Sequence, residues 1–190
     1  PTDEQKRRFT QVLKGHIALA TAVFPQGTTG KEIDVLARKA LWADGQDYAH
    51  GTGHGVGAYL GVHEGPAGIS KTAEVPFAPG MVLSNEPGFY KEGEYGIRTE
   101  NLVVVEEKKG LADDGKAYYG FETITLSPID TRLIDTSLLE RSEVEWLNAY
   151  HERVRETLSP HLPQAERVWL EAKTEPLQVK QRAGTTGRAV

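Results

Sequence analysis

The chain has 190 residues, of which 38% are hydrophobic and 26% are charged, and its formal net charge is −5. These values exclude a disordered or fibrous protein, and the acidic balance gives no basic surface for nucleic acid. No apolar run reaches the length of a membrane span, the charged first residues differ from a secretory signal, and the absence of cysteine fits a cytoplasmic protein.

Two helices are predicted in the first part of the chain. A capping-box pattern begins at Thr2, and apolar residues follow at helical spacing to Ala20, before a stop at Pro25–Gly27. The same pattern repeats from Thr29 and ends near Gly45. The two helices therefore follow each other through a short loop.

Three strands are predicted in the middle of the chain, because β-branched and aromatic residues dominate there. They cover Met81–Ser84, Leu102–Val105 and Tyr118–Leu126. The stretch Asp113–Lys116 carries turn residues and predicts a hairpin between the last two strands.

The helical period returns after Pro128, with one apolar stripe from Leu138 to Tyr150 and a short further helix over residues 168–172. We interpret residues 1–178 as one domain and expect residues 179–190 to form a disordered tail. The pattern predicts an α+β fold in which helices cover one side of a mainly antiparallel sheet.

The stretch His50–Gly57, HGTGHGVG, places two histidines in a backbone of unusual freedom. Glycine costs roughly 0.5–1 kcal/mol relative to alanine in regular structure, so its use here needs a reason. We expect the glycines to provide room for the backbone beside the rings of His50 and His54.

Three residues with metal-ligand side chains lie at the ends of predicted strands. His54 follows the glycine-rich loop, Glu86 ends the strand that begins at Met81, and Glu100 precedes the strand that begins at Leu102. One imidazole and two carboxylates suit Zn, Mn, Co or Fe. A lone histidine or glutamate in a loop is more often solvated, but an unpaired carboxylate inside an apolar strand is expensive to bury. The spacing alone leaves both readings open.

Three separated blocks of the sequence carry a resemblance to a known family. They are HGTGHGVGAYLGVHEGP, GMVLSNEPGFY and YGIRTENLVVV, and the likeness continues through GFETITLSPID and LLERSEVEWLNAYHERV. Together they resemble the C-terminal catalytic domain of Xaa-Pro aminopeptidase, or aminopeptidase P, of the pita-bread metallopeptidase superfamily. The resemblance implies a pita-bread fold with a curved, mainly antiparallel sheet. It also implies release of an N-terminal residue that precedes proline.

The resemblance implies a role for each metal-binding candidate. His54 and Glu86 would bind one divalent ion, and Glu100 would bridge two ions, with manganese favoured over zinc or cobalt. A water held between the ions would be the nucleophile, because coordination lowers its pKa towards neutrality. Glu86 would also take the proton of that water as general base.

Three further residues match positions that face the substrate in the family. His63 matches the histidine that hydrogen-bonds the substrate and stabilises the tetrahedral intermediate. His50 matches another histidine of the substrate pocket, and Arg98 matches an arginine that organises the hydrogen bonds of the metal site. For His50 and Arg98 a purely structural role as hydrogen-bond donors is the alternative.

The chain departs from the family pattern in its metal ligands. The resemblance implies five ligands, of which two are aspartates that precede the first helix of this chain. The aspartates found before His54 are Asp3, Asp34, Asp44 and Asp47, and none of them stands in that position. We therefore expect the N-terminal part of the fold to be missing. We also expect the chain alone to hold at most one metal ion and to be inactive.

Two functions follow from the sequence. The first is part of a cytoplasmic, homodimeric metalloaminopeptidase whose substrate is a peptide with proline in the second position. The alternative is a non-catalytic pita-bread module used for subunit or partner contacts. Metal analysis of the purified chain separates the two.

Overall fold

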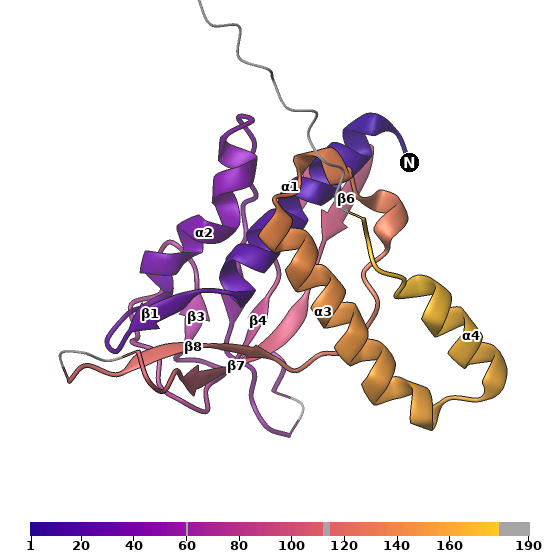
Figure 1. Cartoon of the computed structure of the whole chain (residues 1–190). Coiled ribbons are helices and arrows are strands. Elements are labelled where there is room, and N and C mark those ends of the chain that lie inside the picture. The colour runs from indigo at the N-terminus through magenta and orange to yellow at the C-terminus, as the bar shows by residue number, and fades with distance from the viewer. Residues whose placement is uncertain (60, 112–114, 179–190) are drawn as a thin grey trace, which may run out of the picture.

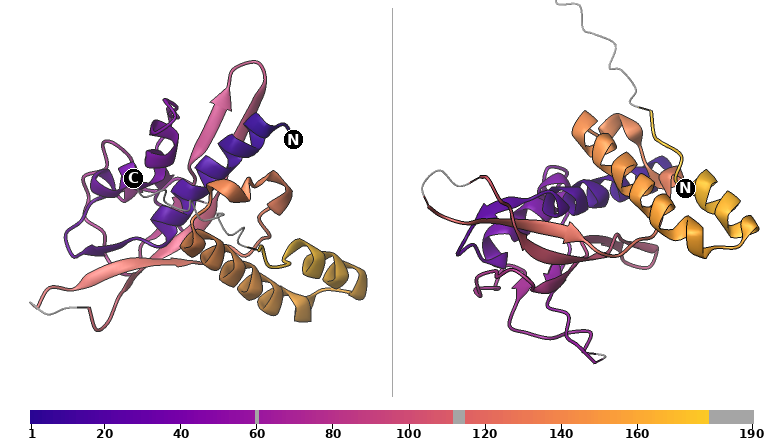
Figure 2. Two further views of the ribbon diagram at one scale, coloured as in Figure 1. Left: turned by 45° about the horizontal axis from the view of Figure 1, so that its top comes forward. Right: turned by 60° about the horizontal axis from the view of Figure 1, so that its bottom comes forward.

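The computed structural model describes residues 1–59, 61–111 and 115–178. Helix α1 lies between α2 and α3, and α4 lies on the side of α3 away from α2 (Figures 1 and 2). The α-helices are α1 (Asp3–Ala20), α2 (Gly30–Trp42), α3 (Arg141–Leu158) and α4 (Gln164–Lys173). The 3₁₀ helices are η1 (Thr131–Leu133), η2 (Thr136–Leu138) and η3 (Ser159–His161). The strands are β1 (Val23–Pro25), β2 (Gly53–His54), β3 (Gly68–Ile69), β4 (Val82–Asn85), β5 (Gly88–Lys91), β6 (Tyr95–Arg98), β7 (Asn101–Glu107) and β8 (Tyr118–Thr123).

The first two helices begin as the sequence predicts. Thr2 and Gln5 form a reciprocal capping box at the start of α1, and Thr29 does so with Glu32 at the start of α2. The two helices pack closely at Gly15 of α1, where an added Cβ atom would lie 2.0 Å from the carbonyl oxygen of Ala37 in α2. A side chain at this position would therefore force the helices apart.

The main sheet has four antiparallel strands in the order β1-β8-β7-β4. Strand β2 pairs with β3, and Gly55, the residue after β2, forms an isolated bridge with Leu83 of β4. Apolar residues of α1 and α2 pack on this sheet, and the cluster includes Leu19, Ile33 and Phe121. The predicted α+β class, with helices on an antiparallel sheet, is confirmed (Figure 1).

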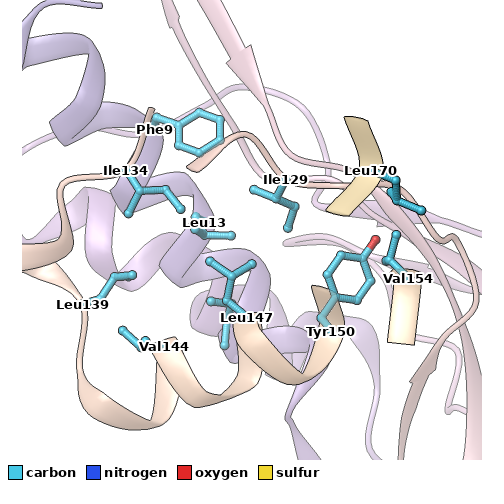
Figure 3. Packing of buried hydrophobic residues seen from close by; sticks show 11 residues of the cluster. Phe9, Leu13, Ile129, Ile134, Leu139, Val144, Leu147, Tyr150, Val154 and Leu170 are labelled. Atoms are coloured by element: carbon cyan, nitrogen blue, oxygen red, sulfur yellow. The ribbon is translucent and has the colours of Figure 1, made fainter. Parts of the chain in front are cut away.

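A second hydrophobic cluster joins α1 to α3 and to the segment between β8 and α3. Figure 3 shows Phe9 and Leu13 of α1 facing Leu147 and Tyr150 of α3, with Leu170 of α4 at one side. The helix that carries Leu147 and Tyr150 thus serves the core, where both residues are buried. Its apolar stripe was predicted from Leu138, but α3 starts only after a 3₁₀ turn.

Several boundaries differ from the predictions. The sequence near Pro25, read as a helix stop, forms the edge strand β1, and the last predicted strand ends at Thr123. No strand was predicted between Glu86 and Glu100, but β5 and β6 form a hairpin there, and Gly88 pairs with Arg98 immediately after Pro87. Part of the predicted turn, residues 113 and 114, and the predicted tail, residues 179–190, lie outside the described residues.

None of the helices in the described part of the chain combines the length and the apolar character that crossing a membrane requires.

Candidate metal centre

His54 lies in the short strand β2 and is held there by its backbone. Its amide donates to Oγ of Ser84 (3.0 Å), and Gly53 beside it pairs with β3. The Nδ1 atom lies 2.9 Å from the Gly55 carbonyl oxygen, which can only accept, so Nδ1 carries a proton, and in a neutral ring Nε2 presents a lone pair that can bind a metal ion. Histidines that bind metal through Nε2 typically have this arrangement.

Glu86 directly follows β4, and only 7% of the residue is exposed. Its backbone amide donates to the carbonyl oxygen of Thr52 (2.8 Å). In the side chain, Oε1 accepts from Oγ of Ser84 (2.8 Å), and Oε2 lies 3.6 Å from Nη1 of Arg98. The carboxylate is thus oriented from both sides, with Oε1 3.1 Å from Nε2 of His54.

The contact between His54 and Glu86 requires a cation. Nε2 of a neutral imidazole and a carboxylate oxygen are both acceptors, and at 3.1 Å they repel each other unless a proton or a metal ion lies between them. Nitrogen and carboxylate oxygen also suit the ions considered above. The pair therefore fits two ligands of a metal centre.

Glu100 is less well placed than the sequence suggested. It precedes β7, as expected, but its side chain is exposed, so the predicted cost of burying it does not arise. No hydrogen bond or ion pair in the described ranges joins it to His54 or Glu86. Among the described residues, no group of three or more His, Asp or Glu side chains is arranged to hold a metal ion. The described part of the chain therefore presents two of the three predicted ligands together and not a complete centre.

The other two candidate histidines, His63 and His50, make different contacts. The ring of His63 lies against that of His54, with centroids 3.9 Å apart and the planes tilted by 37°. His50 donates from Nδ1 to its neighbouring carbonyl (2.7 Å) and accepts at Nε2 from the hydroxyl of Tyr90 (2.9 Å). Nε of Arg98 donates to the same hydroxyl (3.0 Å), and this hydrogen bond raises the pKa of the guanidinium. Contacts thus connect His50, through Tyr90 and Arg98, to Glu86.

The glycines of the loop serve close approach of the backbone. A Cβ atom on Gly53 would lie 2.0 Å from the carbonyl oxygen of Ser84, and one on Gly55 would lie 2.0 Å from that of Glu64. The expected room beside the rings is therefore room for β2 to lie against β4, which brings His54 to Glu86.

Three of the aspartates that precede His54 form ion pairs with arginines. Asp34 and Asp47 pair with Arg38, and Asp44 pairs with two arginines of α1. Sequence reasoning missed three contributors, namely Ser84, Thr52 and Tyr90. Ser84 and Tyr90 both stand in the block GMVLSNEPGFY, so their proximity to Glu86 was the one signal available.

Two family models match most of the chain. Residues 1–107 match metallopeptidase family M24, and residues 117–177 match the C-terminal region of peptidase M24. The chain belongs to metallopeptidase family M24. The first match covers the whole of the site described above.

The curated proteins that resemble this chain include proteins named as aminopeptidases P. A protein of Coprinopsis cinerea named probable Xaa-Pro aminopeptidase P is 52% identical over 183 residues, which cover 93% of this chain and 29% of the relative. Aminopeptidase P1 of Lotus japonicus is 50% identical over 94% of this chain and 28% of its own length. The chain thus spans less than a third of the length of these relatives.

A solved M24 structure confirms the fold. The X-prolyl aminopeptidase of Caenorhabditis elegans, described as a cytosolic enzyme with a di-nuclear active site, superposes with a TM-score of 0.88 at 43% identity. The match covers 93% of this chain and 29% of that structure. The predicted pita-bread fold is therefore correct for this M24 chain.

Proposed function

We propose that residues 1–178 form part of the catalytic domain of a cytoplasmic Xaa-Pro aminopeptidase, which removes an N-terminal residue that precedes proline. The observation that carries the proposal is the contact of His54 with Glu86, two acceptors at 3.1 Å that a cation would join. The names of the relatives, at 50–52% identity, support this substrate class. The cytosolic relative in Caenorhabditis elegans supports the location.

In this proposal His54 and Glu86 would hold a divalent ion, and Glu100 would contribute with the remaining ligands when a second ion is bound. A bound pair of divalent ions, for which we propose manganese, would supply Lewis acidity and a nucleophile at neutral pH. The carboxylate of Glu86 takes up the proton released in the reaction. Hydrogen bonds from Ser84 and the nearby cation of Arg98 keep that carboxylate in one orientation.

The histidines act on the substrate side of the site. His63 lies against His54 and is itself exposed, so a ring N–H of His63 can donate to the carbonyl oxygen of a bound peptide. His50 has its Nε2 atom fixed on the hydroxyl of Tyr90. We infer that His50 lines the pocket for the residues near the scissile bond.

We propose that the chain alone binds at most one divalent ion and does not cleave Xaa-Pro peptides. Two divalent ions a few ångströms apart repel each other, and Glu86 and Glu100 supply too few negative charges to hold both. The lack of a three-ligand group in the described residues supports this. We further propose that the active protein is a homodimer. Light scattering on a longer, active protein that contains these residues tests this proposal by measuring its mass.

Manganese titration of the purified chain tests the assignment. We expect one weak site in the wild type, and its loss in His54→Ala and Glu86→Gln. Glu92→Gln is the matched control, because Glu92 is an exposed glutamate in the turn after β5. Equal affinity in all four proteins would refute the assignment of the ligands.

An activity assay on a short Xaa-Pro peptide, together with metal analysis, tests the proposal that this chain alone is inactive. Two tightly held ions per chain together with turnover would refute the proposal that this chain alone is inactive. In a longer protein that contains these residues and cleaves such peptides, Glu86→Gln should leave less than about a tenth of the turnover, since the positioned base is lost.

A further inference from the structure

A buried ion pair on α2 lies behind the loop that carries His50. Asp34 and Arg38 are each only 2% exposed, and Nε of Arg38 lies 2.7 Å from Oδ2 of Asp34. Buried ion pairs contribute little net stability, because desolvation offsets the attraction between the charges. The pair is therefore better explained by what it holds in place.

The guanidinium of Arg38 uses all five of its N–H groups. Nε and one Nη2 proton donate to Asp34, at 2.7 and 3.3 Å. Nη1 donates to Oδ1 of Asp47 and to the carbonyl oxygen of Tyr48, both at 2.7 Å, and Nη2 also donates to the carbonyl oxygen of His50 (2.9 Å). One side chain thus fixes three points along the loop that leads into the site.

Asp34 extends the same network to Glu86. Its Oδ1 atom accepts from the hydroxyl of Thr52, which also contacts the hydroxyl of Tyr48. The carbonyl oxygen of Thr52 in turn accepts from the amide of Glu86 (2.8 Å). Thr52 is fully buried, so these hydrogen bonds are shielded from water.

His54 is positioned by other means. Its amide is bound by Ser84, its strand β2 is paired with β3, and its ring is bound by the Gly55 carbonyl. None of these contacts involves Asp34 or Arg38. A change at Arg38 should therefore move His50 and spare His54.

We propose that Asp34 and Arg38 are positioning residues for His50, and that they hold its ring where Nε2 meets the hydroxyl of Tyr90. The proposal deepens the proposed function and rests on it only for the part that His50 plays with substrate. Lysine cannot replace arginine here, because three donors on a flexible stem cannot reproduce five donors in a planar fork.

The test is Arg38→Lys in the 190-residue chain, followed by nitrogen NMR of its histidine rings at pH 8. The wild type should show His50 fixed as the Nδ1–H tautomer. In Arg38→Lys the ring signals of His50 should shift several times more than those of His54. Arg7→Lys is the matched control, because Arg7 also pairs with an aspartate, Asp44, but is exposed. Unchanged His50 signals, or equal shifts at both rings, would overturn the proposal.

A measurement on the wild type covers the case in which Arg38→Lys does not fold. With every donor engaged, rotation of the Arg38 guanidinium is hindered, and its four Nη protons should give separate NMR signals. A single averaged signal would overturn the proposal. Added Mn²⁺, which broadens nearby signals, tests the proposed function separately. Failure to broaden His54 would refute the metal site and leave the positioning of His50 intact.

Discussion

Asn85 and Asn101 stand directly opposite each other in the β4–β7 ladder, so Glu86 leaves one strand where Glu100 enters the other. His16 of α1 binds both asparagines. Its backbone oxygen accepts from Nδ2 of Asn85 (3.0 Å), and its Nε2 atom contacts Oδ1 of Asn101 (2.8 Å). The helix thus fixes the two strand ends beside the proposed carboxylate ligands.

The burial of His16 predicts a stability that falls in weak acid. Both His16 and His151 are fully buried, and burial lowers the pKa of each from 6.5 to about 4. Between these values the unfolded chain binds more protons than the folded chain, so the free energy of unfolding decreases as pH falls from about 6.5 to about 4. For His16 alone the loss at pH 5 is about 2 kcal/mol.

Urea unfolding between pH 7.5 and 4.5 measures this loss. In His16→Gln the decrease over this range should be smaller than in the wild type, because one titrating group is removed. The control is His161→Gln at an exposed histidine, for which the wild-type slope is expected. Identical slopes in all three proteins would contradict the prediction.

Ser84→Ala should weaken divalent-ion binding by about 10–100-fold, the range seen when a group that orients a ligand is lost. The Ser84 hydroxyl donates to Glu86 and accepts from the amide of His54, so its removal frees both residues. Calorimetric titration with Mn²⁺ checks this. Ser142→Ala, at an exposed position in α3, should bind as the wild type does, and a similar loss there would show that the effect is not local.

His63→Ala should leave Mn²⁺ affinity within about twofold of the wild type, because the ring of His63 lies against that of His54 and His63 is not proposed as a ligand. In a longer active protein it should lower turnover by about 10²–10⁴-fold, as the loss of a positioned hydrogen-bonding group does. Titration and kinetics on the same variant separate the two effects. Loss of metal together with activity would show that His63 binds the ion.

Gly53→Ala should destabilise the fold by about 2–3 kcal/mol and weaken metal binding, since the added Cβ would meet the backbone of β4 at 2.0 Å. Gly51→Ala is a milder change, because there the nearest atom is the Cβ of Ser70 at 3.2 Å. Thermal unfolding of both variants makes the comparison. Equal destabilisation would mean that the close approach of β2 to β4 is not what requires glycine.

The helices could be predicted because local spacing determines them. The capping boxes at Thr2 and Thr29 and the apolar stripes after them act within a few residues. The edge strand β1 depends on its partner β8, which is far along the chain, and the β5–β6 hairpin shows no clear strand pattern in its own sequence. Pro25 was predicted as part of a helix stop but ends an edge strand, and Pro87 only separates the pairing of β4 with β7 from the pairing of β5 with β6.

Part of the candidate site could be predicted, because only a few residue types can bind a metal ion. Histidine and glutamate at strand ends, together with the three sequence blocks, indicated His54 and Glu86 as neighbours. The contacts that order the site come from backbone geometry, such as the Thr52 carbonyl on the Glu86 amide, and from a side chain of α2, Arg38, on the carbonyl of His50. Such contacts leave no periodic signal in one sequence, and the exposure of Glu100 could not be inferred from its apolar neighbours.

The position of α1 has a consequence for how the protein is made. This helix contributes Leu13 to the cluster with α3 and α4, Leu19 to the cluster on the sheet, and Val12 to a third cluster with Phe89. Its apolar surface leaves the ribosome before the segments that cover it, the last of which surrounds Leu170. Contacts this distant along the chain slow folding, so the face of the newly made helix that carries Leu13 stays open to chaperones until synthesis has passed α4.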